Sequence, residues 1–251
     1  MARFLPRNIR SAWSKLASGA GADNLKNLLA LQGNPDFISY WDEFVGQTAG
    51  TWPASANWGY PATVGTGTEV VGIGASAFGG TLTLTTGANS ADSAGQKFSR
   101  SWRGTEGIYY CARIQLDTIT TAKFEVGLAD SVTGDTGMVA TKATPTHTGT
   151  DYAVFVLDTN DDANVTFISA AAGVTGANAD WSGTLVAATY IDVEIIVKGA
   201  FCSGYINGQY VGGGAITAAT LLTPHVFVLT RTTATRLLTV DYQGCVSPRF
   251  T

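Results

Sequence analysis

The 251-residue sequence predicts an all-β fold, an antiparallel β-sandwich preceded by a short N-terminal helical arm. From residue 37 onward, short runs rich in β-branched and aromatic residues alternate apolar with polar side chains, as half-buried strands do. Turn-forming Gly, Asn, Asp and Thr separate these runs. No helical pattern in this part is long enough to cross over between parallel strands, which excludes a doubly wound parallel sheet. We therefore expect an arm over residues 1–36 and a sandwich over residues 37–251.

The arm is predicted because apolar residues recur at helical spacing in the first 36 residues, whereas they alternate with polar residues from residue 37 onward. Pro6 suits a helix start, and Ile9, Trp13 and Leu16 follow at helical spacing. A second short pattern follows over residues 23–31. Helices of this length are marginal in isolation, so the arm must pack either on its own sandwich or on another protein.

The charge of the arm is opposite to that of the rest of the chain. Residues 1–30 carry five basic residues and one acidic residue, a balance of +4 within a chain of net charge −4. Basic arms bind nucleic acid, membrane surfaces or acidic proteins. The basic residues are spread rather than clustered, which favours an acidic protein surface over a specific nucleic acid. The residues predicted to make this attachment are Arg3, Phe4, Leu5, Arg7, Ile9, Arg10, Trp13 and Leu16.

Nine runs in the sandwich have strand character. One of them, residues 189–199, places Ile191, Val193 and Ile195 on one face and Asp192 and Glu194 on the other. Two Gly/Thr-rich segments are predicted to be long loops: "ATVGTGTEVVGIGASAFGG" and "VTGDTGMVATKATPTHTGTD". The nine strand runs are "FISYWDEF", "GTLTLTT", "GIYYCARIQL", "AKFEVGLAD", "DYAVFVLD", "NVTFISA", "TYIDVEIIVKG", "PHVFVLTRT" and "TRLLTVDY".

A hairpin is predicted in "CSGYINGQYVGG", residues 202–213. Asn207-Gly208 is a favoured pair for a two-residue type I′ turn. In that register Tyr205 and Tyr210 form the next cross-strand pair, which stabilises a hairpin without a ligand. The glycines at 212–214 are predicted to loosen the exit into a loop.

The order of these features resembles a known family. The segments "WDEF", "GGTLTLTTG", "YYCARIQL", "FEVGLADS", "YIDVEIIVKGAFCSGYINGQYVG" and "LLTVDYQGCV" follow one another as in concanavalin- or laminin-G-like jelly rolls of tailed-phage virion proteins. The resemblance covers residues 37–246 and implies an antiparallel jelly-roll sandwich. It implies a non-enzymatic structural protein, a capsid decoration or auxiliary protein of a bacteriophage, made in the host cytoplasm and located in the virion.

The same resemblance implies the partners. They are the major capsid protein or other virion proteins, contacted through the arm, and further copies of this chain in a homo-oligomer, with a trimer as the expected state. The alternative is a carbohydrate-binding, lectin-like adhesion module on the virion surface or tail.

Catalysis is disfavoured by the residues available. A retaining glycosidase needs two carboxyl groups close together, and only Asp192 and Glu194 alternate on one strand. A third acid of the hydrolase pattern is missing, because position 197 is valine, so the two carboxylates are interpreted as solvent-facing charges. His147 and His225 lack nucleophile or metal-ligand companions, and alternation with Val226 predicts a surface or edge position for His225. No catalytic residue is predicted.

No metal or cofactor is predicted. Asp158, Asn160 and Asp162 match the start of a calcium loop, but Ala163 and Ser169 stand where glycine and glutamate are needed. The segment joins two predicted strands and is interpreted as a turn.

Three aromatic residues are the sequence candidates for glycan binding. Trp52, Trp58 and Tyr60 lie in a Pro/Gly loop, where they either stack on sugar rings or pack within the protein. Packing is the favoured interpretation.

The cysteine pattern and the hydropathy place further limits on the class of protein. Cys111, Cys202 and Cys245 are interpreted as three buried thiols, with a single disulfide as the alternative. No signal peptide and no run of about 18 apolar residues is present, so neither secretion by the general route nor a membrane partner is expected.

Overall fold

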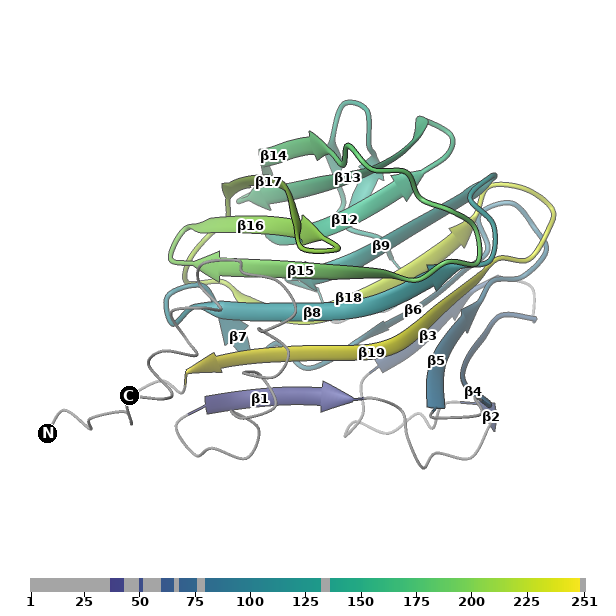
Figure 1. Cartoon of the computed structure of the whole chain (residues 1–251), viewed down its shortest axis with the longest axis horizontal. Helices are drawn as coiled ribbons and strands as arrows, with labels where there is room; N and C mark the ends of the chain where they lie inside the picture. The colour runs from purple at the N-terminus through teal and green to yellow at the C-terminus, as the bar shows by residue number, and fades with distance from the viewer. Residues whose placement is uncertain are drawn as a thin grey trace, which may run out of the picture.

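The computed structural model describes residues 37–42, 50–51, 60–65, 68–75, 80–131 and 136–248. Two antiparallel sheets pack face to face, and Figure 1 looks onto the outer face of one with the other behind it. The all-β antiparallel sandwich is therefore confirmed. The predicted helical arm, residues 1–36, lies outside the described residues. Within the described ranges, no helix has the length and apolar character to cross a membrane.

The sheet nearer the viewer in Figure 1, called sheet A, has nine strands within the described residues. The N-terminal strand β1 (Phe37–Asp42) pairs with the C-terminal strand β19 (Leu237–Pro248), which brings the two ends of the sandwich together. The remaining order runs β17 (Gln209–Ala215), β16 (Phe201–Ile206), β15 (Ile191–Lys198), β8 (Ile108–Leu116), β19, β5 (Gly80–Thr85), β4 (Val70–Ala75) and β2 (Gly50–Thr51).

The second sheet, sheet B, has eight strands. Its order is β14 (Val174–Asp180), β13 (Asp162–Ala171), β12 (Tyr152–Asp158), β9 (Ala122–Ala129), β18 (Leu221–Thr230), β6 (Ser93–Lys97) and β3 (Tyr60–Val64), with β7 (Trp102–Arg103) paired to β18. A separate hairpin is formed by β10 (Val139–Thr141) and β11 (Thr146–His147).

The main core fills the space between the sheets. Val193 and Ile195 point into it from sheet A, and Phe124, Val126 and Phe155 point into it from sheet B, each with no exposed surface. The expected alternation in β15 is confirmed, since its apolar positions are buried while Asp192 and Glu194 are half-buried on the opposite face. Burial of this apolar area is the main source of the sandwich's stability.

A second, smaller apolar cluster lies on the outer face of sheet B. Val154, Val156 and Ile168 from β12 and β13 pack there against Met138 and Val139. The β10–β11 hairpin therefore lies against this face, inside a segment for which the sequence predicted only a long loop. That prediction was wrong over residues 139–147, because burial of Val139 and Met138 orders the chain there.

All nine strand runs expected from the sequence form strands, but several other strands were missed. β3 and β4 lie in the other segment predicted as a loop, and β6 and β14 have no prediction at all. β6 reads SAGQK and β14 reads VTGANAD, so both lack the β-branched and aromatic residues that signal a strand. In β14, small residues are needed because the backbone of β17 in the other sheet lies close to Gly176.

The close approach is clearest at the edge where β14 and β17 meet, which lies at the top of Figure 1. A Cβ atom added at Gly214 would lie 2.1 Å from the carbonyl oxygen of Gly176. The predicted loosening of the chain at residues 212–214 is therefore wrong: these glycines are in β17, and two backbones pack directly there. Only glycine permits this contact.

The predicted type I′ turn is confirmed. Asn207 and Gly208 have φ angles of 51° and 74°, and Tyr205 lies opposite Tyr210 in the register. Ile206 points into the core, so Tyr205 and Tyr210 project from the outer face of sheet A.

Candidate functional site

The register of sheet A brings polar and aromatic residues together on its outer face. Glu194 lies opposite Cys111 on β8 and opposite Tyr205 on β16. Two residues further along β15 on the same outer face, Asp192 lies opposite Arg113 of β8. Arg113 in turn lies opposite Tyr242 of β19. We call this set the tyrosine–carboxylate surface; its members are Tyr109, Tyr190, Tyr205, Tyr210, Tyr242, Asp192, Glu194, Asp241 and Arg113.

Two tyrosine hydroxyls hold the carboxylates of β15 in place. Tyr109 Oη donates to Glu194 Oε2 over 2.8 Å, and Tyr242 Oη donates to Asp192 Oδ1 over 2.8 Å. Burial raises the pKa of both phenols, and the carboxylate each one faces raises it further. Both phenols therefore remain protonated donors at neutral pH, and both carboxylates are oriented before any ligand arrives.

Arg113 lies among the acidic residues of this surface. Its Nη1 is 3.5 Å from Asp241 Oδ2, its Nε is 4.0 Å from Asp192 Oδ1, and its guanidinium carbon is 4.9 Å from the centre of the Tyr190 ring. These ion pairs are partly exposed and contribute little to stability. Their effect is to position the guanidinium among hydrogen-bond acceptors, and acidic groups still outnumber basic ones on the surface.

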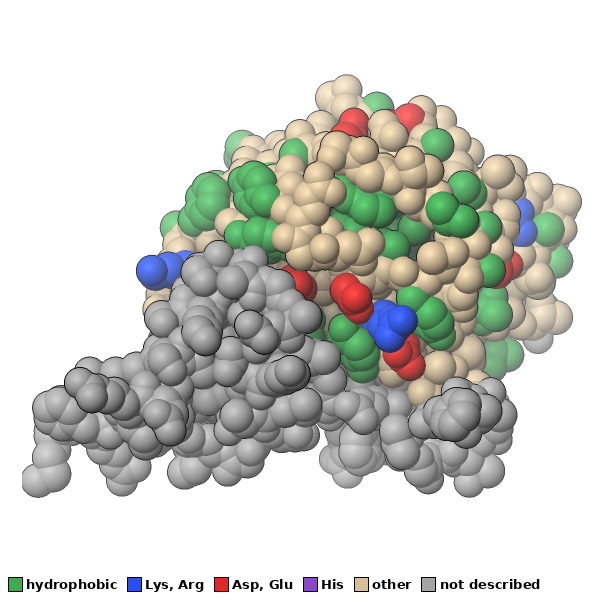
Figure 2. Space-filling view, viewed as in Figure 1, with side chains coloured by type: hydrophobic (Ala, Val, Ile, Leu, Met, Phe, Trp, Pro, Cys, Tyr) green, Lys and Arg blue, Asp and Glu red, His purple; other side chains and the backbone are tan. Residues whose placement is uncertain are grey.

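Tyr210 is the exposed aromatic residue of this surface, while Tyr205 is half-buried and Tyr109 is buried. Tyr210 is 56% exposed, and its ring meets that of Tyr205 edge to face, with centroids 5.6 Å apart. Figure 2 shows acidic and basic side chains side by side on this face, with hydrophobic side chains gathered beside them. Oriented carboxylates accept hydroxyl protons, and exposed phenol rings pack on C–H groups, so the surface suits a ligand with many hydroxyls and an apolar face.

The turn of the β16–β17 hairpin is hydrogen-bonded to the strand that carries Asp192. The backbone N–H of Asp192 donates to Asn207 Oδ1 over 2.9 Å, and the N–H of Asn207 donates to the Asp192 carbonyl over 2.8 Å. The asparagine that the type I′ turn requires therefore also fixes the end of β15 that carries Asp192.

The side chains of the sequence candidates for glycan binding and attachment all fall outside what the structure describes. Trp52 and Trp58 lie outside the described residues, and the structure places the backbone of Tyr60 in β3 without describing its side chain. The attachment residues between Arg3 and Leu16 also lie outside the described part. The surface residues that the sequence analysis missed are Tyr109, Arg113 and Tyr242, because only the register reveals their proximity to Asp192 and Glu194.

The prediction for His225 was wrong. It is fully buried on the outer face of sheet B, where its Nε2 lies 3.4 Å from Glu125 Oε2. Burial lowers the pKa of His225 to about 4, despite the attraction of Glu125. Lys123, whose Nζ is 2.9 Å from Glu125 Oε1, and His225 lower the pKa of Glu125 to about 2 against the effect of burial. Alternation correctly placed His225 away from the core, but it could not show that the β10–β11 hairpin and its flanking residues cover this face.

The other histidine lies in the hairpin itself. His147 is in β11, where its Nδ1 contacts Tyr152 Oη and its Nε2 lies 3.0 Å from Thr175 Oγ1. These contacts tie the hairpin to β12 and β14.

The acidic segment after β12 is a turn, as predicted. The Asp158 carboxylate pairs with Arg231 and accepts the N–H of Asn160 over 3.2 Å, and Asp162 Oδ1 accepts the N–H of Asn164 over 2.7 Å and pairs with Lys142. Across the part of the chain that the structure describes, no group of three His, Cys, Asp or Glu residues is arranged to hold a metal ion.

The cysteines are three free, buried thiols, which confirms the favoured interpretation and excludes a disulfide among them. Burial raises the pKa of each thiol above its usual range. They act as small apolar residues in the sandwich.

Comparisons with known proteins identify the fold. No protein-family model and no curated protein sequence matches the chain. Among solved structures, a protein of unknown function from Shewanella oneidensis MR-1 (SO2946) has a TM-score of 0.60 at 10% identity, over 92% of this chain and 97% of that one. Peanut lectin in complex with a nine-residue peptide has a TM-score of 0.55 at 10% identity, over 86% and 99%. The carbohydrate recognition domain of Emp47p has a TM-score of 0.54 at 6% identity, over 87% and 100%.

These likenesses confirm the lectin-like, concanavalin-like jelly-roll sandwich expected from the strand pattern. At such identities they establish the fold alone. They do not bear on the predicted origin in a phage particle.

Proposed function

We propose that the chain is a non-enzymatic carbohydrate-binding module that holds a saccharide on its tyrosine–carboxylate surface. The observation that carries this proposal is the exposed Tyr210, packed on the half-buried Tyr205, beside two carboxylates that Tyr109 and Tyr242 already orient. Peanut lectin and the Emp47p carbohydrate recognition domain have the same sandwich, which supports the class of function without identifying the site.

Binding requires no bond to be broken. The C–H face of a sugar ring packs on Tyr210, whose exposed area gives up water on contact. Neighbouring hydroxyls of the sugar donate to Asp192 and Glu194, and Arg113 donates to an acceptor oxygen on the same ring. Because the acceptors are fixed before binding, little ordering entropy is lost on association.

The charge of the surface indicates the class of saccharide. Three carboxylates face one guanidinium there, so an acidic sugar is repelled while a neutral, hydroxyl-rich sugar finds acceptors. The proposed ligand is therefore a neutral saccharide.

The test is glycan-array screening of the full chain, followed by calorimetric titration of the best neutral oligosaccharide. Tyr210→Ala removes an exposed ring that packs on Tyr205, and should weaken binding by about five- to tenfold. Asp192→Asn should weaken binding to a similar degree, because the amide keeps the acceptor for Tyr242 but loses the charge.

Leu221→Ala is the matched control, since it truncates an exposed apolar residue on the other sheet and should leave the affinity unchanged. Equal affinities for Tyr210→Ala and the wild type would contradict the proposed surface. Failure to bind any neutral glycan would contradict the function. A reducing-end assay with the same oligosaccharide, run on the wild type and on Glu194→Gln, should show no hydrolysis by either.

A further inference from the structure

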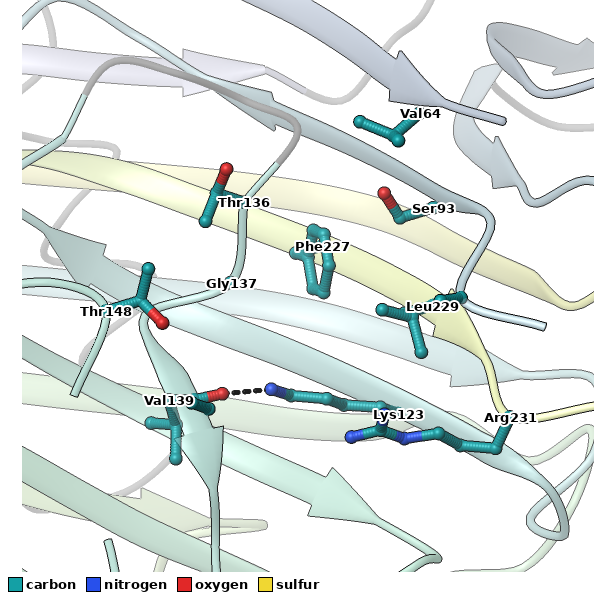
Figure 3. A pocket seen from close by; sticks show the side chains of 12 residues that line it. Val64, Ser93, Lys123, Thr136, Gly137, Val139, Thr148, Phe227, Leu229 and Arg231 are labelled. Carbon is teal, nitrogen blue, oxygen red and sulfur yellow. Dashed lines mark hydrogen bonds between the residues drawn. The ribbon is translucent and has the colours of Figure 1, made fainter. Parts of the chain in front are cut away.

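A cavity of about 380 Å³ opens on the outer face of sheet B, on the opposite side of the sandwich from the tyrosine–carboxylate surface. Its floor is formed by Phe227 and Leu229, which alternate along β18 with core residues and so point outward. Figure 3 shows these side chains between Ser93 of β6 and the chain segment that carries Thr136 and Val139. A cavity of this size is in the range that holds small molecules.

Residues 136–139 form the wall of the cavity opposite sheet B, and buried charged side chains of that sheet hold them in place. Lys97 Nζ donates to the Thr136 carbonyl over 3.1 Å, and Lys123 Nζ donates to the Val139 carbonyl, a contact drawn in Figure 3. Glu125 accepts the N–H groups of Met138 and Val139. Buried charges persist only where such partners exist, so these contacts fix the segment on the sheet and keep the cavity preformed.

The charges that border the cavity are of one sign. Among its twelve lining residues, the two charged ones are Lys123 and Arg231. Their carboxylate partners, Glu125 and Asp158, are buried behind them and do not line the cavity. The two ion pairs therefore border the cavity through their basic members, and Ser93, Thr136 and Thr148 also line it.

We propose that this cavity binds a small organic anion: a carboxylate on a compact body with an apolar side. The carboxylate would lie near Lys123 and Arg231, where a fork of guanidinium donors matches its geometry. The apolar side would rest on Phe227 and Leu229. This ligand class is opposite in charge to the neutral saccharide proposed for sheet A, so the two sites are independent.

The experiment uses two pairs of probes that match in size and differ in charge: benzoate with benzamide, and glucuronate with glucose. Each is titrated into the ¹⁵N-labelled full chain, and amide shifts are followed at Gly137, Ala140 and Thr148. In at least one pair the anion should bind ten times or more tightly than its neutral partner, and that preference should weaken as salt is raised.

A blocking variant and a matched control locate the binding. Ala140→Trp places a large side chain at an exposed residue of the cavity rim and should abolish anion binding. Ala143→Trp makes the same exchange at an exposed residue of the same hairpin away from the cavity and should retain it.

The outcomes separate this proposal from the one for sheet A. Tyr210→Ala should leave anion binding unchanged. Absence of binding by either anion, equal binding of anions and neutral partners, or full binding by Ala140→Trp would each overturn the proposal.

Discussion

At the scale of single residues, the least expected finding is a set of ionisable side chains buried on the outside of sheet B. Lys97, Lys123, Glu125 and His225 have almost no exposed surface, although all four point away from the core. The three charges are offset by one another or by backbone groups of residues 136–139, and His225 is uncharged at neutral pH. These residues attach a chain segment to the outer face of the sheet.

His225 makes the stability of the protein depend on pH. Its pKa is near 6.5 in an unfolded chain and about 4 in the folded one, so the unfolded state binds more protons between these values. The free energy of unfolding should therefore be highest above pH 6.5 and fall by about 3 kcal/mol as the pH drops to 4. Urea denaturation from pH 7.5 to 4 measures this slope.

His225→Gln removes the titrating ring and should flatten this dependence, whatever its effect on stability at pH 7.5. Glu125 contributes only at the acid end of this range, because its lowered pKa affects stability between pH 4.5 and about 2, so the slope between pH 7.5 and 5 reports His225. An unchanged slope in His225→Gln would show that other groups cause the pH dependence.

At the scale of elements, the edge where β14 and β17 meet is held by glycine. Gly214→Ala would place a methyl group 2.1 Å from a backbone carbonyl oxygen that cannot rotate away. We expect a loss of about 2–3 kcal/mol in the free energy of unfolding, in the range of overpacked sites. Chemical denaturation followed by tryptophan fluorescence gives the value.

Gly173→Ala is the matched control for that exchange. The added methyl group meets nothing within 4 Å, and the cost is limited to the positive φ of 75° in the β13–β14 turn, roughly 1 kcal/mol. If Gly214→Ala loses no more stability than Gly173→Ala, the contact between the sheets does not have the expected cost.

The elements also show what the sequence could reveal. Strands with bulky alternating residues, such as β12 and β15, were predictable because each one carries its own signal. β6 and β14 were not, because their small residues acquire strand geometry only from neighbours. The candidate site follows the same rule. Asp192 and Glu194 were evident as an outward pair, but Tyr242 joins them only through pairing between strands distant in sequence.

At the scale of the whole molecule, the strands from β1 to β19 form two sheets that enclose the main core between them. Deleting residues 1–36 should therefore leave a folded domain, with a melting temperature within a few degrees of the full chain. Calorimetry of both proteins tests this. The deletion also tests the predicted role of Arg3, Trp13 and the other arm residues, since an attachment arm should be lost without loss of fold.

A fall of ten degrees or more would favour the other alternative, an arm that packs on its own sandwich. Sedimentation of the full and truncated chains over a range of concentrations would then show whether the arm also carries the predicted self-association.

The pairing of β1 with β19 has a consequence for the way the protein is made. Phe37 lies opposite Pro248, so β1 meets its partner only after the roughly 200 residues between them have been synthesised. At usual translation rates this delay is on the order of ten seconds or more, during which β1 has no neighbour in its sheet. Sandwiches with such distant pairings fold slowly, because a long loop must close before the contact is gained. During that interval the unpaired edge of β1 can pair with other chains, and charged side chains on an edge strand oppose such pairing.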